Sequence, residues 1–274
     1  MRNNGRVPSS SSILNRFTDP TRRWFGGAFP APTPAQQGAW KAIADGENTL
    51  VIAPTGSGKT LSAFLWALDS LAARPDRSKG TRVLYISPLK ALAVDVERNL
   101  RAPLAGITRA SQELGITEPS ITVGVRSGDT PAAQRRLLAK TPPDILITTP
   151  ESLFLMLTSQ ARETLAQVGT VIVDEVHAVA GTKRGTHLAV SLDRLDALLD
   201  RPAQRIGLSA TVRPVEEVGR YLTGGRPVSI VQPPSTKQWD LQVVVPVPDL
   251  ADLANQPGES DDDPTRSASV WPHV

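Results

Sequence analysis

Seven short apolar runs, most of them rich in β-branched residues, constrain the fold of this chain most strongly. Segments with helical periodicity separate most of the runs, which are TLVIA (49–53), RVLYIS (82–87), SITVGV (120–125), DILITT (144–149), TVIVDE (170–175), QRIGLS (204–209) and VSIVQ (228–232). Continuously apolar strands that alternate with helices are typical of a parallel sheet covered by helices on both faces. We therefore predict an α/β fold built on a doubly wound parallel sheet.

Composition excludes several classes of protein. The 274 residues contain no cysteine, so the chain has neither a disulfide framework nor a thiolate metal site. No apolar run approaches the length of a membrane span, and we expect a cytoplasmic protein without a membrane partner. The formal net charge of +3 permits a polyanionic partner but does not require one.

The two ends of the chain differ from its middle. Residues 1–20 combine arginines with a run of serines and predict a flexible basic leader. Residues 249–264 contain six acidic side chains among glycines and prolines, which is typical of an exposed linker. We therefore expect one globular domain at 21–232, followed by a linker at 233–274.

The first strand leads into the loop PTGSGKT (54–60), which is followed by a helix. Glycines that turn backbone N–H groups inward, together with a helix N-terminus, form a site for a triphosphate. The loop residues expected around the phosphates are Thr55, Gly56, Ser57 and Gly58. Lys59 would reach the β and γ phosphates, and the Thr60 hydroxyl would hold Mg²⁺. The alternative is a glycine-rich turn that only caps a helix.

A pair of acids indicates what happens to that nucleotide. Asp174 and Glu175 follow the buried run TVIV. One carboxylate at a strand end suits Mg²⁺, and a second beside it suits the base that orients and deprotonates water in a hydrolase. We assign the metal to Asp174 and the catalytic base to Glu175; two merely exposed acids are the alternative.

A later strand ends in the sequence SAT at 209–211. The Ser209 and Thr211 hydroxyls are in a position to hydrogen-bond to His177 and to the strand end that bears Asp174, which would couple the two strand ends. The competing interpretation is a cap for a helix over 212–222.

Two further strand ends predict contacts with a nucleic-acid backbone. The strands end at Ser87 and Thr149, and a proline that would begin a helix follows each of them. Helix starts of this kind bind phosphates, and Lys90 and Arg126 would add positive charge beside a single strand. Ordinary helix starts are the alternative, and we expect a solvated turn at residues 183–185.

Taken together, PTPAQ, APTGSGKT, DEVH and SAT resemble the Q motif and motifs I, II and III of superfamily 2 helicases in order and spacing. Residues 85–107 and 174–198 are similar to the Lhr (large helicase-related) family. The resemblance spans residues 29–222 and implies a RecA-like domain that binds ATP. It also implies that Gln36 reads adenine, with Phe29 as a ring partner; Gln37 is the alternative if the register is shifted by one residue.

The same resemblance implies a function for the whole protein. Lhr-like helicases are expected to translocate 3′ to 5′ on single-stranded DNA and to unwind DNA or RNA:DNA duplexes in DNA repair. Such a motor needs a second RecA-like domain that supplies arginines to the γ phosphate, and we expect this chain to be the first motor domain, with little ATP hydrolysis of its own. A Ski2-like RNA helicase and a non-catalytic, ATP-gated nucleic-acid-binding module are the alternatives.

Overall fold

The computed structural model describes residues 11–74 and 80–234. The chain divides into two compact units, Met1–Pro233 and Pro234–Val274, and the fold below is that of the first. From residue 235 onward the expected linker lies outside the described residues. None of the helices in the described ranges is long and apolar enough to cross a membrane.

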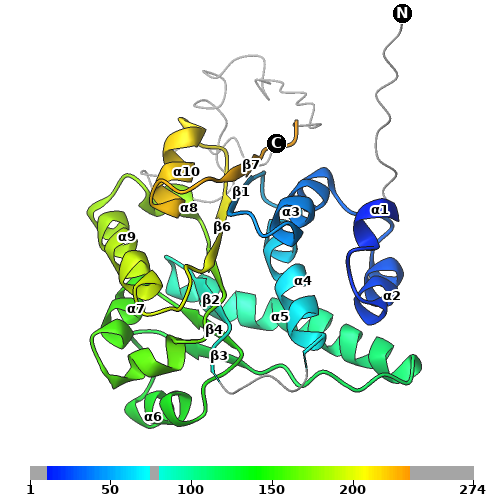
Figure 1. The fold of residues 1–274 in the computed structure, drawn as a ribbon, viewed down its shortest axis with the longest axis horizontal. Helices are drawn as coiled ribbons and strands as arrows, with labels where there is room; N and C mark the ends of the chain where they lie inside the picture. Colours follow the sequence, from blue (N-terminus) through cyan, green and yellow to red (C-terminus); the bar gives the residue numbers. More distant parts are fainter. Residues whose placement is uncertain (1–10, 75–79, 235–274) are drawn as a thin grey trace, which may run out of the picture. The chain divides into compact units, whose positions relative to one another are not determined.

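A seven-stranded, all-parallel sheet forms the centre of the domain, in the order β3-β4-β2-β5-β6-β1-β7 (Figure 1). The strands are β1 (Thr49–Ile52), β2 (Val83–Ile86), β3 (Val123–Arg126), β4 (Ile145–Thr148), β5 (Thr170–Val173), β6 (Gln204–Ser209) and β7 (Ser229–Val231). Each lies within or next to one of the seven apolar runs, so the predicted parallel sheet is confirmed. The five inner strands are buried along almost their whole length, which explains why the sequences of β1, β2, β4, β5 and β6 do not alternate between apolar and polar residues.

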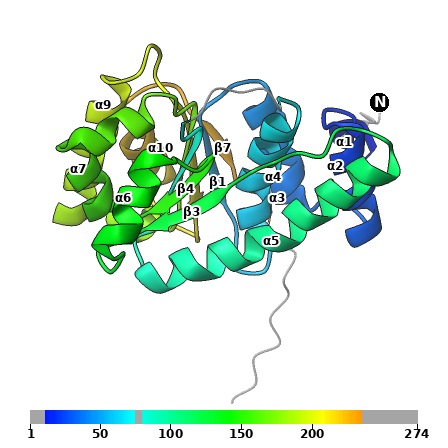
Figure 2. The same cartoon turned by 90° about the horizontal axis from the view of Figure 1, so that it is seen from below.

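Helices cover both faces of the sheet (Figure 2), which confirms the doubly wound fold. The helices are α1 (Ser11–Leu14), α2 (Asp19–Ala28), α3 (Pro34–Ala44), α4 (Lys59–Ala72), α5 (Lys90–Glu113), α6 (Ala132–Lys140), α7 (Pro150–Leu157), α8 (Val176–Val179), α9 (Lys183–Asp196) and α10 (Val215–Thr223), with a 3₁₀ helix at Gln160–Leu165. Val51 faces a core cluster with α3, α4 and α5, whereas Leu50 and Ile52 face the cluster with α7 to α10. Because successive side chains of a strand point to opposite faces of the sheet, the sheet divides the core into two halves.

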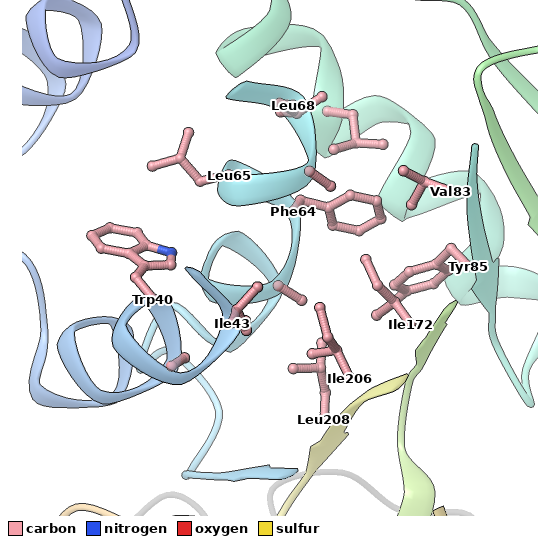
Figure 3. Close-up of a cluster of buried hydrophobic side chains, with 14 of the residues drawn as sticks. Trp40, Ile43, Phe64, Leu65, Leu68, Val83, Tyr85, Ile172, Ile206 and Leu208 are labelled. Atoms are coloured by element: carbon pink, nitrogen blue, oxygen red, sulfur yellow. The ribbon is translucent and has the colours of Figure 1, made fainter. Parts of the chain in front are cut away.

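The first of these clusters lies between α3, α4 and the sheet (Figure 3). Trp40 of α3 is fully buried there, and Phe64 of α4 stacks on Tyr85 of β2 with ring centroids 4.9 Å apart. Phe17 packs edge-on against Trp40 at 5.0 Å, and the Thr18 hydroxyl donates to Asp69 at 2.6 Å. The expected leader therefore needs correction: its first ten residues lie outside the described part, but Phe17 belongs to the core because an aromatic ring is stabilised by burial.

Helix starts explain how the strand ends are arranged. Pro150 begins α7 as predicted, and the Thr149 hydroxyl accepts the Ser152 N–H as its cap. The other expected start is wrong: α5 begins at Lys90, two residues after Pro88. The Ser87 hydroxyl accepts the Leu89 N–H and donates to the Leu89 carbonyl, and this local turn delays the helix.

Candidate functional site

The phosphate-binding loop lies between the end of β1 and the start of α4. Gly56 and Gly58 have φ values of +78° and +79°, a conformation that glycine adopts without strain. The Thr33 hydroxyl, at the start of α3, donates to the Ser57 carbonyl at 2.9 Å and anchors the loop. Lys59 is the first residue of α4, and its ammonium donates to the Ser209 carbonyl of β6 at 3.3 Å. The unpaired N–H groups of the first turn of α4 therefore open onto this loop beside a lysine, which suits an anion.

The acid pair lies directly after β5. Asp174 is 9% exposed, and its two carboxylate oxygens have different donors: the Tyr85 hydroxyl donates to Oδ2, and the Glu175 N–H donates to Oδ1 at 2.9 Å. Burial, followed by the negative charge of Asp174 and the hydrogen bond to it, raises the pKa of Tyr85 well above its ordinary value. The phenol therefore remains a donor. Each carboxylate oxygen keeps a lone pair for a further ligand.

Glu175 has a left-handed backbone conformation, with φ at +46°. Among the described residues it is the one non-glycine residue with a positive φ. Such a conformation costs roughly 1–3 kcal/mol in a non-glycine residue and is concentrated at functional sites. The turn places the Glu175 carboxylate 3.3 Å from His177 Nδ1.

His177 links the acids to the end of β6. Its Nδ1 accepts the Ala210 N–H at 3.2 Å and lies 3.3 Å from the Ser209 hydroxyl. An acceptor Nδ1 places the proton of a neutral ring on Nε2, so the contact between Glu175 and Nδ1 is then proximity without a hydrogen bond. The structure thus brings Ser209 and His177 together. Thr211 is exposed, and α10 starts only at Val215, so the sequence SAT does not cap that helix.

A cavity of about 560 Å³ joins the phosphate-binding loop to the acid pair. The predicted residues that line it are Gln36, Phe29, Thr55, Gly56, Gly58, Lys59, Thr60, Asp174 and Glu175. Gln36 is 4% exposed, and its amide oxygen accepts the Thr33 N–H at 2.9 Å while its nitrogen lies 3.5 Å from the Gly58 carbonyl. Gln37 does not line the cavity, since its amide donates to the Pro32 carbonyl at 3.1 Å. The geometry favours Gln36 over Gln37 as the nucleotide-facing glutamine.

Sequence reasoning missed several residues of this cavity. Trp24 of α2 lies beside Phe29, with ring centroids 5.9 Å apart, and α5 contributes Asp95 and Asn99 to the same wall. Tyr85, which does not line the cavity but donates to Asp174, escaped notice because it lies inside an apolar run. Only the aromatic sequence WFGGAF at 24–29 carried a signal, since aromatic side chains cluster before the first motif.

Oxygen ligands suited to Mg²⁺ occur in the same cavity. Thr60 and Asp174, which carry a hydroxyl and a carboxylate, both line it, next to the loop that would hold phosphates. Mg²⁺ prefers a small number of carboxylate and hydroxyl oxygens together with phosphate oxygens and water. These two residues fit that donor set.

The residues predicted to contact nucleic acid lie at the carboxyl ends of neighbouring strands. Ser87 is buried, the Thr149 hydroxyl caps α7, and Arg126 ends β3. Burial, with a smaller contribution from Arg135, lowers the pKa of Arg126. Lys90 begins α5, and its side chain lies outside the described part. The structure places the ends of β3, β4 and β2 side by side at one edge of the sheet, with Arg126 and Ile86 both paired with Thr148.

An ion pair joins the first turns of α7 and α9 at this edge. Arg184 donates to both carboxylate oxygens of Glu151, at 2.5 and 2.9 Å, and to the Pro88 carbonyl at 2.5 Å. The hydrogen bond from Arg184 is the largest cause that lowers the pKa of Glu151 to about 2. The expected solvated turn at 183–185 is wrong, because Lys183 begins α9 and Gly185 is buried.

Comparison with known proteins places this geometry in a family. The DEAD/DEAH box helicase family matches residues 33–218. The chain is 67% identical to an Lhr helicase and probable uracil glycosylase of Mycolicibacterium smegmatis over 95% of its own length, and 54% identical to an Lhr helicase/uracil glycosylase of Escherichia coli over 97%. It spans only 17% and 18% of the length of these two relatives.

A solved structure agrees with the sequence relatives. The fold superimposes on the M. smegmatis helicase Lhr, bound to single-stranded DNA and AMP-PNP, with a TM-score of 0.82 and 66% identity. That match covers 95% of this chain and 32% of the solved one. The chain has the RecA-like fold of such motors, and it belongs to the DEAD/DEAH box helicase family, within which it is similar to Lhr helicases.

Proposed function

We propose that the chain is the ATP-binding first motor domain of a longer, ATP-dependent DNA helicase and translocase. The observation that carries the proposal is the single cavity that contains the phosphate-binding loop, the acid pair and Gln36. A turn that only caps a helix would not need two carboxylates and a buried amide in the lining of the same cavity. The relative that binds AMP-PNP supports ATP as the nucleotide.

Each side chain of the cavity has a role in this proposal. Lys59 exchanges its present contact with the Ser209 carbonyl for the β and γ phosphates. Thr60 and Asp174 would hold Mg²⁺, and a bound Mg²⁺ would neutralise charge on the phosphates. Glu175 orients the attacking water and takes its proton. His177, which contacts both Glu175 and the Ala210 N–H, couples a movement of Glu175 to the end of β6.

The described residues that line the cavity include no arginine. Arginines that reach the γ phosphate are worth about 10³ to 10⁵ in rate. We propose that a second RecA-like domain of the whole protein supplies them, and the greater length of the relatives supports this. The chain alone would then bind ATP and hydrolyse it slowly.

The nucleic-acid partner in this proposal is a single strand of DNA, held at the strand ends near Ser87, Lys90, Arg126 and Thr149. The relative bound to single-stranded DNA supports this choice. From the family resemblance we further propose 3′ to 5′ movement, unwinding of DNA and RNA:DNA duplexes, and a cytoplasmic role in DNA repair. A Ski2-like RNA helicase is the alternative, and unwinding of DNA and RNA duplexes by the whole protein distinguishes the two.

A non-catalytic, ATP-gated module is the alternative from another class. The left-handed Glu175 speaks against it, because a binding module has no need of a strained carboxylate beside the phosphates. In the whole protein, Glu175→Gln should retain ATP binding and lose most turnover. Unchanged turnover in that variant would contradict the assignment of Glu175 as the base.

The direct test is calorimetric binding of Mg²⁺-ATP to this chain and to Lys59→Ala, with phosphate release followed in the same samples with and without single-stranded DNA. We expect binding to fall at least tenfold in Lys59→Ala, because its ammonium contacts the phosphates, while turnover stays near background. Lys140→Ala is the matched control, since Lys140 is an exposed lysine at the end of α6. Turnover at the rate of an intact motor would show that the catalytic set is complete in this chain.

A further inference from the structure

Sheet geometry places the Tyr85 side chain beside Asp174. Tyr85 of β2 lies directly opposite Ile172 of β5. Because side chains alternate along a strand, Asp174, which lies two residues after Ile172 and just beyond the end of β5, projects on the same face as Ile172. A diagonal neighbour at this spacing is within reach of an aromatic side chain. The Tyr85 hydroxyl accordingly donates to Asp174 Oδ2.

The ring of Tyr85 is held firmly. Its residue is fully buried, and Phe64 stacks on it with an interplanar angle of 23° (Figure 3). Phe64 belongs to α4, the helix whose first residue is Lys59. The hydroxyl therefore cannot leave Asp174 without disturbing the packing between the phosphate-binding helix and the sheet.

The second oxygen of Asp174 is held as well, by the Glu175 N–H at 2.9 Å. With one donor on each oxygen, the plane of the carboxylate is fixed. A buried phenol is chemically suited to hold this carboxylate, because it donates one hydrogen bond and carries no charge, whereas an ammonium would compete with a cation for the same oxygens. Donors behind a metal-binding carboxylate commonly determine its orientation and affinity.

We propose that Tyr85 is a positioning residue, which orients the Asp174 carboxylate for the Mg²⁺ that accompanies the nucleotide. The inference rests on the proposed function, because it concerns the metal of the same site. It adds a residue that none of the four helicase-like motifs contains. Tyr85 acts through Asp174 and does not contact the nucleotide.

Tyr85→Phe tests the inference, since it removes the hydroxyl and keeps the stacked ring. ATP binding to the full chain is measured by calorimetry over a series of Mg²⁺ concentrations and in EDTA. We expect the affinity in EDTA to be unchanged and the gain produced by Mg²⁺ to fall about tenfold or more, the usual effect of losing a partner behind a metal ligand. A double-mutant cycle with Asp174→Asn should show that Tyr85→Phe has no further effect once the carboxylate is gone.

The chain offers a matched control, because it contains only two tyrosines. The Tyr221 hydroxyl donates to the Gly185 carbonyl at 2.9 Å, in the other half of the core. Tyr221→Phe should lower the stability of the domain, because it removes a structural hydrogen bond, and should leave the Mg²⁺ dependence of ATP binding unchanged. A second measurement needs no variant at position 85: in chain labelled with 3-fluorotyrosine, the ¹⁹F resonance of Tyr85 should shift when Mg²⁺ joins the bound nucleotide, while that of Tyr221 stays.

The possible failures are distinguishable. If the wild-type chain binds no ATP, the proposed function is wrong and this inference falls with it. If the wild type binds with a clear Mg²⁺ dependence and Tyr85→Phe retains that dependence in full, only the inference about Tyr85 is overturned. A Tyr85 resonance that does not respond to Mg²⁺ would overturn it in the same way, even if Tyr85→Phe failed to fold.

Discussion

Gly56 and Gly58 provide a controlled test of how the phosphate-binding loop supports the rest of the site. Both have nearly the same left-handed φ, but their surroundings differ. A Cβ on Gly58 would lie 2.4 Å from the Gln36 side-chain nitrogen, whereas a Cβ on Gly56 would meet nothing within 4 Å. Gly56→Ala therefore adds backbone strain alone, and Gly58→Ala adds the same strain and also displaces Gln36.

The magnitudes follow from these contacts. An alanine in the left-handed region costs roughly 1–2 kcal/mol, and the two variants share this loss of stability. Displacing Gln36 also breaks its hydrogen bond with the Thr33 N–H, which contributes about 0.5–1.5 kcal/mol. We expect Gly58→Ala to unfold roughly 2–4 °C below Gly56→Ala, since about 1 kcal/mol has that effect in a domain of this size.

Nucleotide selectivity separates the two variants more clearly than stability does. Both substitutions disturb the phosphates, which ATP and GTP share, so the ratio of the two affinities isolates the base. If Gln36 hydrogen-bonds adenine, its displacement should lower the preference for ATP over GTP about fivefold, the equivalent of one neutral hydrogen bond near 1 kcal/mol. Calorimetry with both nucleotides measures this. An equal ATP-to-GTP ratio in Gly56→Ala and Gly58→Ala would refute the role of Gln36.

Two further predictions concern the edge where the loops meet. Glu151→Gln should lower the free energy of unfolding at pH 7 by about 0.5–1 kcal/mol, because Glu151 is more than half exposed and solvent screens its pair with Arg184. Since the folded pKa is lowered to about 2, that contribution is fully present above the ordinary value of 4.5, and thermal melts of the two proteins should converge as the pH falls from 4.5 toward 2. Gly185→Ala should lower the free energy of unfolding by about 3 kcal/mol, because its Cβ would lie 1.9 Å from the Val179 carbonyl oxygen. A Cβ at Gly181 would meet nothing within 4 Å, so the free energy of unfolding of Gly181→Ala should stay within about 0.5 kcal/mol of the wild-type value. Thermal melts of both variants measure this. Equal melting temperatures for the two glycine variants would contradict the close packing at Gly185.

The sheet was predictable because its signal is local. Each strand is a run of apolar residues whose type and length are visible in the sequence, and even the short edge strand β7 was predicted within 228–232. The phosphate-binding loop was predictable for the same reason, since its glycines, lysine and threonine are consecutive. Helix starts were less so: Pro150 begins a helix and Pro88 does not, because the Ser87 hydroxyl forms a local turn that a proline rule does not anticipate.

Contacts between distant residues were not predictable from local patterns. Arg184 contacts Glu151 and Pro88, which precede it by 33 and 96 residues, and the letters KRG on their own are typical of a surface turn. Similarly, Phe17 lies in a polar, arginine-rich segment, and only the presence of Trp40 and Trp66 nearby in space explains its burial. In each case the contact depends on the packing of helices and loops that are far apart in the sequence.

Tyr85 shows where the limit lies for the functional site itself. As a letter inside the run RVLYIS, it is one more apolar strand residue. Its hydroxyl reaches Asp174 only because β2 pairs with β5. The two residues are 89 positions apart in the sequence, and β3 and β4 lie between them along the chain. If β2 paired with β6 instead, the same tyrosine would lie beside that strand and would leave the Asp174 carboxylate without its buried donor. The order of strands in the sheet, more than any motif, therefore decides which residues can support the metal-binding carboxylate.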